Sequence, residues 1–496
     1  MSQPVPVQSS PFATDVLKLV TGTTIAQIIA ILASPILTRL YGPEAFGFFA
    51  LFTSITAIVG VIACMRYELA IMLPRDDGEA VNLLALCFLM VAIISSLTGI
   101  GLFFGGSVLL TLLQAPDLAP YLWLVPPFVF VSGVFLALNY WNSRTRLFGR
   151  LSIARITQAV TTTGTQLGAG LSGYVSGGSL IGASLAGSIV STGVLGGQIW
   201  RDDRALLKRC VSWRGMINGL KRYKRFPMID SSSALLNTVS WQLPALLLSA
   251  FFSPVIVGFY ALGMRVLHTP MSFIGSSIAQ VFFQRAAEAR RAGNLGTLVE
   301  NVFRVLVLIG LFPLLVLTVI GGDIFIVVFG EVWQEAGIYV QILGIWTFIW
   351  FISSPLSTLY IVLEKQDFGL KYNIANLTTR LVSLIIGGLM GSVYVALGLF
   401  AISGILVYGY LCVSLMRFSE ASLLTAGKVI LSNFFLFIPV GAILLLLKFF
   451  DVHAIILVFV ASIAMILYYI YLIKTDVQIR NVLQQFGLLK FLEKSG

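Results

Sequence analysis

Charged side chains are scarce in this sequence, making up 11% of its 496 residues while 58% are hydrophobic. A soluble protein of this length needs much more polar surface, so the composition excludes one. The mean hydropathy of +0.95 indicates instead a protein that lies within a membrane. Its apolar runs are continuous and lack the two-residue alternation of a transmembrane β-barrel, which favours helices over strands.

Residue types that carry metal, disulfide and nucleotide chemistry are also rare or missing. The only histidines, His268 and His453, are too few and too far apart for a metal site. No Walker A phosphate loop occurs, which excludes an ATP-driven motor in this chain. The four cysteines fall within predicted helices or on the predicted cytoplasmic side: Cys64, Cys87, Cys210 and Cys412. We therefore expect no metal, no cofactor, no disulfide and no catalytic residue.

Fourteen windows are long enough, at about 20 residues each, to cross a hydrocarbon core about 30 Å thick. They span residues 17–38, 44–64, 81–105, 120–141, 151–174, 178–200, 229–251, 254–283, 301–321, 336–360, 370–391, 393–416, 428–447 and 454–474. The expected fold is therefore an all-α, polytopic membrane protein with about fourteen transmembrane helices.

A nine-residue phrase occurs twice in the chain, as PEAFGFFAL from Pro43 and as PVIVGFYAL from Pro254. A second pair, FGRLSIAR from Phe148 and FGLKYNIAN from Phe368, keeps the same order and nearly the same spacing. Such internal symmetry is typical of transporters built from two similar helix bundles around a central site. The two six-helix halves begin after zero and six predicted crossings, both even numbers, so they run parallel, and the last two helices are an addition.

This symmetry predicts a division of the chain into lobes that rock about a central cavity and expose it alternately to the two sides of the membrane. The predicted parts are a disordered cytoplasmic tail at 1–16, an N-lobe at 17–200, a basic cytoplasmic linker at 201–228, a C-lobe at 229–417, two further helices within 428–474 and a cytoplasmic tail at 475–496.

Lysine and arginine are distributed very unevenly between the predicted loops. One alternate set of loops holds 25 of the 32 basic residues, whereas the other set holds only Arg39 and Lys448. By the positive-inside rule the basic set lies in the cytoplasm, and both termini lie there with it.

The linker at 201–228 interleaves nine basic residues with apolar ones such as Leu206, Trp213 and Leu220. This mixture suits a helix in the cytoplasmic headgroup layer, where its cations contact anionic phospholipid. The linker could gather an anionic lipid-linked substrate, or it could serve only as a topology anchor. Because topology explains the net charge of +11, nucleic acid is not an expected partner.

Five arginines lie within or at the ends of predicted membrane helices, and they form a candidate cationic site: Arg39, Arg66, Arg155, Arg265 and Arg380. Arg265 and Arg380 fall near mid-depth, where no acidic residue is placed to pair with them. An arginine there costs about 2.5 to 3.5 kcal/mol on insertion scales and should face protein or water. A phosphate or carboxylate of a substrate would supply an anion. Alternatively, each arginine bonds helix-end carbonyls or extends to the membrane surface.

Amide and aromatic side chains on the predicted helices add groups that suit sugar recognition. These candidate sugar contacts are Gln158, Gln166, Asn139, Asn237, Trp241, Gln242, Asn373 and Asn376. Trp346 and Trp350 lie one helical turn apart, and they could stack on sugar rings or pack between helices.

Four stretches carry a family resemblance: TRLYGPEAFGFFAL from Thr38, RYELAIMLPR from Arg66, PVIVGFYAL from Pro254 and SPLSTLYIVLEKQDFGLKYNIA from Ser354. The chain resembles the polysaccharide transporter family, which includes O-antigen and exopolysaccharide flippases and belongs to the multidrug/oligosaccharidyl-lipid/polysaccharide flippase superfamily. The resemblance implies a bacterial inner membrane and translocation of undecaprenyl-diphosphate-linked oligosaccharide. In the related lipid II flippases a basic residue in a place similar to that of Arg265 contacts the substrate.

Two alternative functions stay open at the level of the sequence. A cation-coupled drug or small-molecule antiporter of the same superfamily would need an acid within the membrane, whereas the predicted site is cationic. A membrane glycan polymerase or ligase would need a sizeable external loop, and none is predicted. For a flippase, the implied partners are lipid-linked oligosaccharide, polysaccharide polymerase and chain-length proteins.

Overall fold

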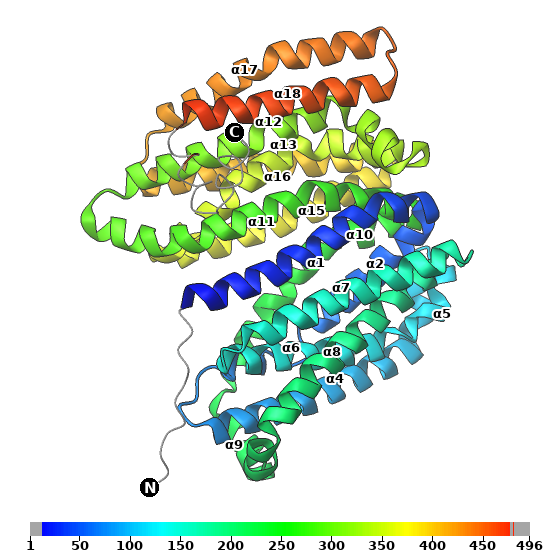
Figure 1. Ribbon diagram of the computed structural model, residues 1–496, viewed down its shortest axis with the longest axis vertical. Coiled ribbons are helices and arrows are strands. Elements are labelled where there is room, and N and C mark those ends of the chain that lie inside the picture. The colour runs from blue at the N-terminus through cyan, green and yellow to red at the C-terminus, as the bar shows by residue number, and fades with distance from the viewer. Residues whose placement is uncertain (1–11, 477–479, 481–496) are drawn as a thin grey trace. The chain divides into compact units, whose positions relative to one another are not determined.

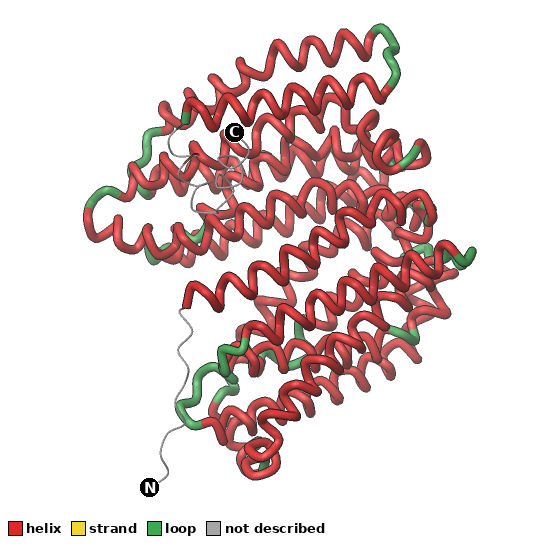
Figure 2. The backbone as a smooth tube through the Cα atoms, in the orientation of Figure 1, coloured by secondary structure: helices red, strands yellow, loops and turns green. Residues whose placement is uncertain are grey.

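The computed structural model of the protein describes residues 12–476 and residue 480. All regular structure in this part of the chain is helical, and Figure 2 shows helices joined by short loops without a strand. A helix bonds its backbone N–H and C=O groups within itself, which is what apolar runs in a hydrocarbon environment require. The predicted all-α class is confirmed.

The chain forms two compact units, one ending at Gly258 (unit 1) and one beginning at Phe259 (unit 2). The division falls within the first turns of the long helix α11 (Pro254–Ala292). The predicted division into lobes, with its boundary in the linker at 201–228, stays a prediction.

Unit 1 is a bundle of long helices connected by short ones. Its helices are α1 (Phe12–Leu40), α2 (Pro43–Gly60), α3 (Tyr67–Ala70), α4 (Asp77–Leu112), α5 (Ala119–Leu122), α6 (Val125–Arg144), α7 (Phe148–Leu171), α8 (Gly177–Cys210), α9 (Trp213–Arg222) and α10 (Ser231–Phe251). Helix α1 packs along α7, and α6 packs between α4 and α8, as Figure 1 shows. Helix α10 packs on α2, where Ser54 Oγ donates to Gln242 Oε1 at 3.0 Å.

Unit 2 repeats this kind of bundle and ends in two further helices. After α11 it contains α12 (Leu295–Phe329), α13 (Gln334–Leu356), α14 (Leu359–Val362), α15 (Gln366–Leu389), α16 (Val393–Phe418), α17 (Leu423–Phe449) and α18 (Ala454–Thr475). Helix α12 packs on α13, and α16 packs on both α13 and α15. The pair α17 and α18, orange and red in Figure 1, lies side by side against α12.

A proline in α12 helps to explain how the last helix is attached. Pro313 has no N–H to donate to the carbonyl of Ile309, one turn earlier in the helix. Tyr469 of α18 donates its hydroxyl to that carbonyl at 3.0 Å, and Tyr468 donates to the neighbouring carbonyl of Leu308 at 2.7 Å. The Tyr468 ring also stacks on Phe312, with 4.2 Å between centroids. Helix α18 thus bonds the carbonyl that the proline leaves open.

Every one of the fourteen predicted windows coincides with a helix. Among the described residues, ten helices are long and apolar enough to cross a membrane, or eleven if the bent pair Pro116–Leu122 and Val125–Arg144 forms one span. The remaining windows correspond to α7, α11 and α15, which are more polar. The protein is a multi-pass membrane protein, and the number of fourteen crossings stays a prediction.

The segments predicted to be cytoplasmic meet at one end of unit 1. Arg144, at the end of α6, forms an ion pair with Asp77 at the start of α4, at 2.8 Å. Arg222, at the end of α9, contacts Glu79 in the first turn of α4 at 2.9 Å. These contacts join the start of α4, the end of α6 and the end of α9. All three belong to basic segments that are predicted to lie in the cytoplasm.

The corresponding segments of unit 2 are joined in the same way. Arg290 of α11 lies 3.1 Å from Glu364, between α14 and α15. The Ser422 N–H, before α17, donates to Glu300 of α12 at 2.6 Å. Within each unit, the alternation of basic loops therefore matches the course of the helices.

The two copies of the repeated phrase meet at their first turns, within unit 1. A Cβ atom on Gly47 would lie 1.8 Å from the carbonyl oxygen of Pro254. A Cβ atom on Gly258 would lie 1.9 Å from the carbonyl oxygen of Pro43. Because each glycine faces the proline of the other copy, the contact is reciprocal, as at a local two-fold axis. No residue larger than glycine fits at either position without moving the backbone.

This close approach predicts that Gly47→Ala and Gly258→Ala each destabilise the protein. The obstructing atoms are backbone oxygens, which cannot turn aside as a flexible side chain can, so we expect a loss of about 1 to 3 kcal/mol or more. Thermal unfolding and the folded yield from size-exclusion chromatography would measure it. Gly60→Ala on α2 is the matched control, because no atom lies within 4 Å of a Cβ there. Equal stability of all three variants would contradict the proposed constraint.

Candidate functional site

The three arginines predicted to lie inside the membrane fall on the three polar helices. Arg155 lies on α7, Arg265 on α11 and Arg380 on α15. These are also the helices that are too polar to count as spans by composition. A polar helix in a membrane must have protein or water beside its polar face. We therefore take these helices as the framework of the candidate site.

Arg380 is the most deeply buried of these arginines, at 2% exposure. Its Nη2 donates to the hydroxyl oxygen of Tyr408 on α16 at 3.0 Å. Asn376, one turn earlier on α15, donates its Nδ2 to the same oxygen at 3.3 Å. The guanidinium carbon lies 5.7 Å from the ring centroid of Phe400 and 5.9 Å from that of Tyr408. A shared hydroxyl and two aromatic rings thus surround this charge; we call these four residues the Arg380 cluster.

A wall of aromatic rings packs beside the Arg380 cluster. His268 of α11 stacks on Trp350 of α13, with 4.3 Å between ring centroids and an angle of 5°. Trp346, one turn away, packs edge-on against Phe400 at 4.9 Å. Gly404 makes room for it, because a Cβ there would lie 2.1 Å from Trp346 Cδ1. Both tryptophans are therefore buried between helices in this conformation, which favours the packing interpretation over sugar stacking.

Arg265 differs from Arg380 because its side chain is exposed. It lies one helical turn before His268 on α11 and forms no ion pair with any described residue. The structure does not bring Arg265 and Arg380 into contact. An exposed guanidinium keeps its five donors available for an anion, whereas a buried one has already committed some of them.

The candidate arginines of unit 1 each have a partner inside that unit. Arg155 donates to Thr23 Oγ1 of α1 at 2.5 Å, and Arg39 donates to the carbonyl of Pro35 at 3.3 Å. Arg66 pairs with Glu68 at 3.3 Å. For Arg39 this is the helix-end bonding that the sequence left open as an alternative. None of these three is brought together with Arg265 or Arg380 within one unit.

Glu68 is a fully buried carboxylate on the short helix α3, outside the candidate spans. Burial raises the pKa of this carboxyl, while its own backbone N–H and the Arg66 guanidinium act to lower it. The contact thus commits part of the Arg66 guanidinium to Glu68 rather than to a substrate.

The predicted sugar contacts are scattered over both units. Gln158 donates to Ser188 Oγ of α8 at 3.4 Å, and Gln242 accepts from Ser54. Gln166 is buried, and its backbone carbonyl accepts from the Tyr41 hydroxyl at 2.8 Å. The exposed members are Asn237 and Asn373, and the half-buried ones are Asn139 and Trp241. Asn376 joins a candidate arginine, because it shares the Tyr408 hydroxyl with Arg380.

Sequence reasoning missed Tyr408, Phe400 and the stacking of His268. An uncharged aromatic residue in an apolar helix gives no signal of its own. Tyr408 lies 28 residues from Arg380 along the chain, so only the fold brings the two together.

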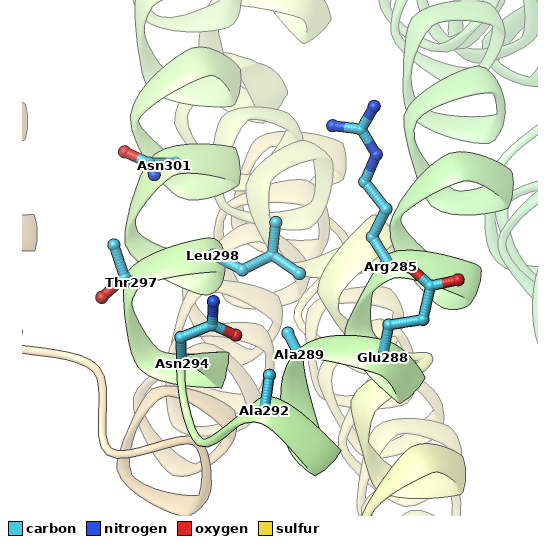
Figure 3. A pocket seen from close by; sticks show the side chains of 8 residues that line it. All are labelled: Arg285, Glu288, Ala289, Ala292, Asn294, Thr297, Leu298 and Asn301. Carbon is cyan, nitrogen blue, oxygen red and sulfur yellow. The ribbon is translucent and has the colours of Figure 1, made fainter.

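A pocket of about 430 Å³ opens where α11 turns into α12. Figure 3 shows Arg285 and Glu288 on the last turns of α11 and Asn294 and Leu298 at the start of α12, with both charged groups pointing along α11. Its two titratable side chains have opposite charges and are exposed. The pocket belongs to a segment predicted to be cytoplasmic and shows no selectivity for an anion.

A protein-family model matches most of the chain and shows the family to which it belongs. A family model described as polysaccharide biosynthesis protein matches residues 36–338, more than half of the sequence. The chain belongs to this family. The resemblance noted in the sequence is confirmed, and the matched region includes α7 and α11.

Two relatives define what the chain is similar to. It is 26% identical over 178 residues to the lipopolysaccharide biosynthesis protein WzxC of Escherichia coli (strain K12), which covers 35% of this chain. The match spans only 36% of the length of that relative. The fold is similar to that of the lipid II flippase MurJ in an inward closed conformation, with a TM-score of 0.72 and 12% identity over 92% of this chain and 99% of that one.

A transporter of another kind shows the same general fold at lower similarity. A mutant form of the Vibrio cholerae MATE transporter VcmN gives a TM-score of 0.51 at 14% identity, covering 83% of this chain and 99% of that chain. At these identities the two structures show the fold alone.

The Arg380 cluster predicts that Tyr408→Phe destabilises the protein. The change removes the oxygen that accepts from both Arg380 and Asn376 and leaves buried donors unsatisfied, so we expect a loss of about 1 to 3 kcal/mol. Tyr410→Phe on the same helix is the control, because Tyr410 is 64% exposed. Thermal unfolding in detergent would compare them. An unchanged midpoint for Tyr408→Phe would show that the hydroxyl does not hold the arginine.

Proposed function

We propose that this protein is a flippase that moves undecaprenyl-diphosphate-linked oligosaccharide repeat units across the bacterial inner membrane. It exposes its substrate site alternately to the two sides, and the product serves the synthesis of O-antigen, exopolysaccharide or capsule. Lipid-linked oligosaccharide is its substrate, and polysaccharide polymerase and chain-length proteins are its partners. The basic linker at 201–228 contacts anionic phospholipid on the cytoplasmic side.

One observation carries this proposal, namely that cationic and amide side chains concentrate on α7, α11 and α15 in an otherwise apolar helical protein. Polar faces at membrane depth serve ions or polar substrates. The family is named for polysaccharide biosynthesis, and the fold is shared with a protein named as a lipid II flippase. A substrate that joins a lipid, a diphosphate and sugars needs both a cationic and an amide-rich surface.

Arg265 is the residue best placed to hold the diphosphate. Its side chain is exposed on a polar helix and has no ion pair among the described residues. A guanidinium offers two parallel donors to a phosphate oxygen pair, which a lysine cannot match. Asn373, which is also exposed and lies in the same unit, remains available to sugar hydroxyls.

Arg380 acts differently from Arg265 in this proposal. Because it is buried in the Arg380 cluster, it does not contact the substrate in this conformation. Its positive charge still contributes to the potential that attracts an anion to this side of unit 2, since charges in a low-dielectric surrounding act over long distances.

Replacement of Arg265 should slow export of the glycan. A charge-assisted hydrogen bond contributes roughly 1.5 to 3 kcal/mol, so Arg265→Gln should reduce export about tenfold or more and Arg265→Lys should restore part of it. The measurement is polymer export in a knockout strain that carries each variant at normal expression. Arg285→Gln, on the same helix but in the cytoplasmic pocket, is the control. Full export with Arg265→Gln would exclude the arginine from substrate binding.

The orientation of the chain gives a separate test of the same proposal. The uneven distribution of basic residues predicts that the segment after Gly322, which forms the last turns of α12 in the structure, is external and that both termini are cytoplasmic. Reporter fusions after Gly322 and after Gln485 should therefore give opposite results; Gln485 lies outside the described residues. An external signal for the tail would refute this topology.

A further inference from the structure

Unit 1 carries a narrow apolar groove between α4, α6 and α8, with a volume of about 430 Å³. It is lined by Val81, Leu84, Ala85, Phe88, Val134, Leu138, Thr192, Gly193, Gly196, Ile199, Trp200, Leu207, Lys208 and Val211. Apart from Thr192 and Lys208, every lining residue is apolar or glycine. Such a groove fits a hydrocarbon chain rather than a sugar or a peptide.

Two glycines on α8 leave this space open. A Cβ on Gly193 would meet no atom within 4 Å, and one on Gly196 would meet only Leu138, at 3.4 Å. The glycines are therefore not needed for close packing of the helices, since larger side chains would fit there and would partly fill the groove.

One end of the groove is cationic. Trp200, Arg204 and Lys208 follow each other at four-residue intervals on α8, so they lie in one row along the helix. The Lys208 ammonium lies 5.6 Å from the centre of the Trp200 ring. Arg204 and Lys208 are exposed and form no ion pair with any described residue.

The neighbouring acids do not neutralise this end. Asp202 pairs with Arg150 at 2.5 Å and with Arg201 at 3.1 Å. Asp203 accepts from Trp141 Nε1 at 3.0 Å. Asp77 and Glu79, in the first turn of α4, pair with Arg144 and Arg222. These four carboxylates thus have partners other than Arg204 and Lys208.

The length of the groove matches one leaflet of a membrane. From Lys208 to Thr192 is 16 residues along α8, or about 24 Å at 1.5 Å per residue. A leaflet with its headgroups is roughly 20 to 22 Å thick. The cationic end belongs to the basic, predicted cytoplasmic side, and the exposed indoles of Trp200 and Trp213 suit the headgroup level there.

We propose that this groove binds an anionic glycerophospholipid, with one acyl chain between α4, α6 and α8 and the phosphodiester against Arg204 and Lys208. Two cations one helical turn apart can reach the two free oxygens of a single phosphodiester. The site concerns a resident lipid and not the transported molecule, so it holds whether or not the protein is a flippase.

Native mass spectrometry of the purified full-length protein tests the headgroup. The protein is equilibrated with equal amounts of dioleoylphosphatidylglycerol and dioleoylphosphatidylethanolamine, and bound lipid is measured. We expect preferential retention of the anionic lipid, and a loss of affinity of about tenfold for one bound lipid in Arg204→Gln/Lys208→Gln. The charge control is Arg285→Gln/Arg291→Gln, which removes two exposed cations of α11, outside the basic linker and outside the row, and should retain the preference.

The acyl chain is tested by filling the groove. Gly193→Leu should reduce binding of the anionic lipid by a similar factor, whereas Gly197→Leu should not, because Gly197 lies outside the groove and a Cβ there meets no atom within 4 Å. A phosphatidylglycerol with a photoreactive acyl chain should label peptides of α4, α6 or α8 in vesicles. This labelling needs no variant and so does not depend on whether Gly193→Leu folds.

Three results would overturn the proposal. Equal retention of the two phospholipids by the unaltered protein would exclude recognition of the phosphodiester charge. Labelling only outside α4, α6 and α8 would exclude the groove. Displacement of phosphatidylglycerol by an equal amount of undecaprenyl phosphate, with labelling lost from these helices, would assign the groove to a polyprenyl lipid.

Discussion

Polar groups inside a hydrocarbon environment must find their partners within the protein, and the arrangement of this molecule depends on that constraint. It explains why all described regular structure is helical. It also explains how neighbouring helices attach, because a carbonyl that its own helix leaves open can accept from a side chain of another. Pro313 leaves the Ile309 carbonyl open, and Tyr469 of α18 donates to it. Tyr41, just after α1, also donates to a helix carbonyl, the backbone carbonyl of Gln166 on α7, although no proline leaves that one open. Tyrosines, which carry no charge that would mark them in the sequence, thus help to fix how helices attach to each other.

The fold could be predicted from the sequence to the extent that it follows from composition and repetition. Apolar runs gave the helices, and the repeated phrase indicated the internal symmetry. The contact between the copies could not be predicted, because the phrase shows only that Gly47 and Gly258 are equivalent, not that each faces the other copy's proline. Hydropathy also undervalues α7, α11 and α15, whose arginines and amides lower the average although the helices lie among long apolar ones. A helix that is shielded by its neighbours need not be apolar all round.

The candidate site was predictable residue by residue but not as a site. Charge alone singles out Arg155, Arg265 and Arg380, since a cation in an apolar helix is unusual. Their surroundings depend on residues distant in sequence and without charge, such as Tyr408 and Phe400 beside Arg380. Arg66 is the exception, because its partner Glu68 is only two positions away and was visible as a neighbour. Local pairs can be read from a sequence, whereas pairs formed by tertiary packing require the coordinates.

The difference in burial between Arg265 and Arg380 has a mechanistic consequence. A guanidinium held by a hydroxyl and two rings cannot follow a substrate that moves, because its donors are already oriented. It can only provide a constant positive potential. An exposed guanidinium on a long side chain can stay bonded to a phosphate over several ångströms of movement, at the cost of its own rotamer freedom. Under the proposed function both properties serve transport of an anionic lipid, since the anion must first be attracted and must then be released on the other side. One arginine fixed by aromatic packing and one left exposed meet these two requirements with the same side chain.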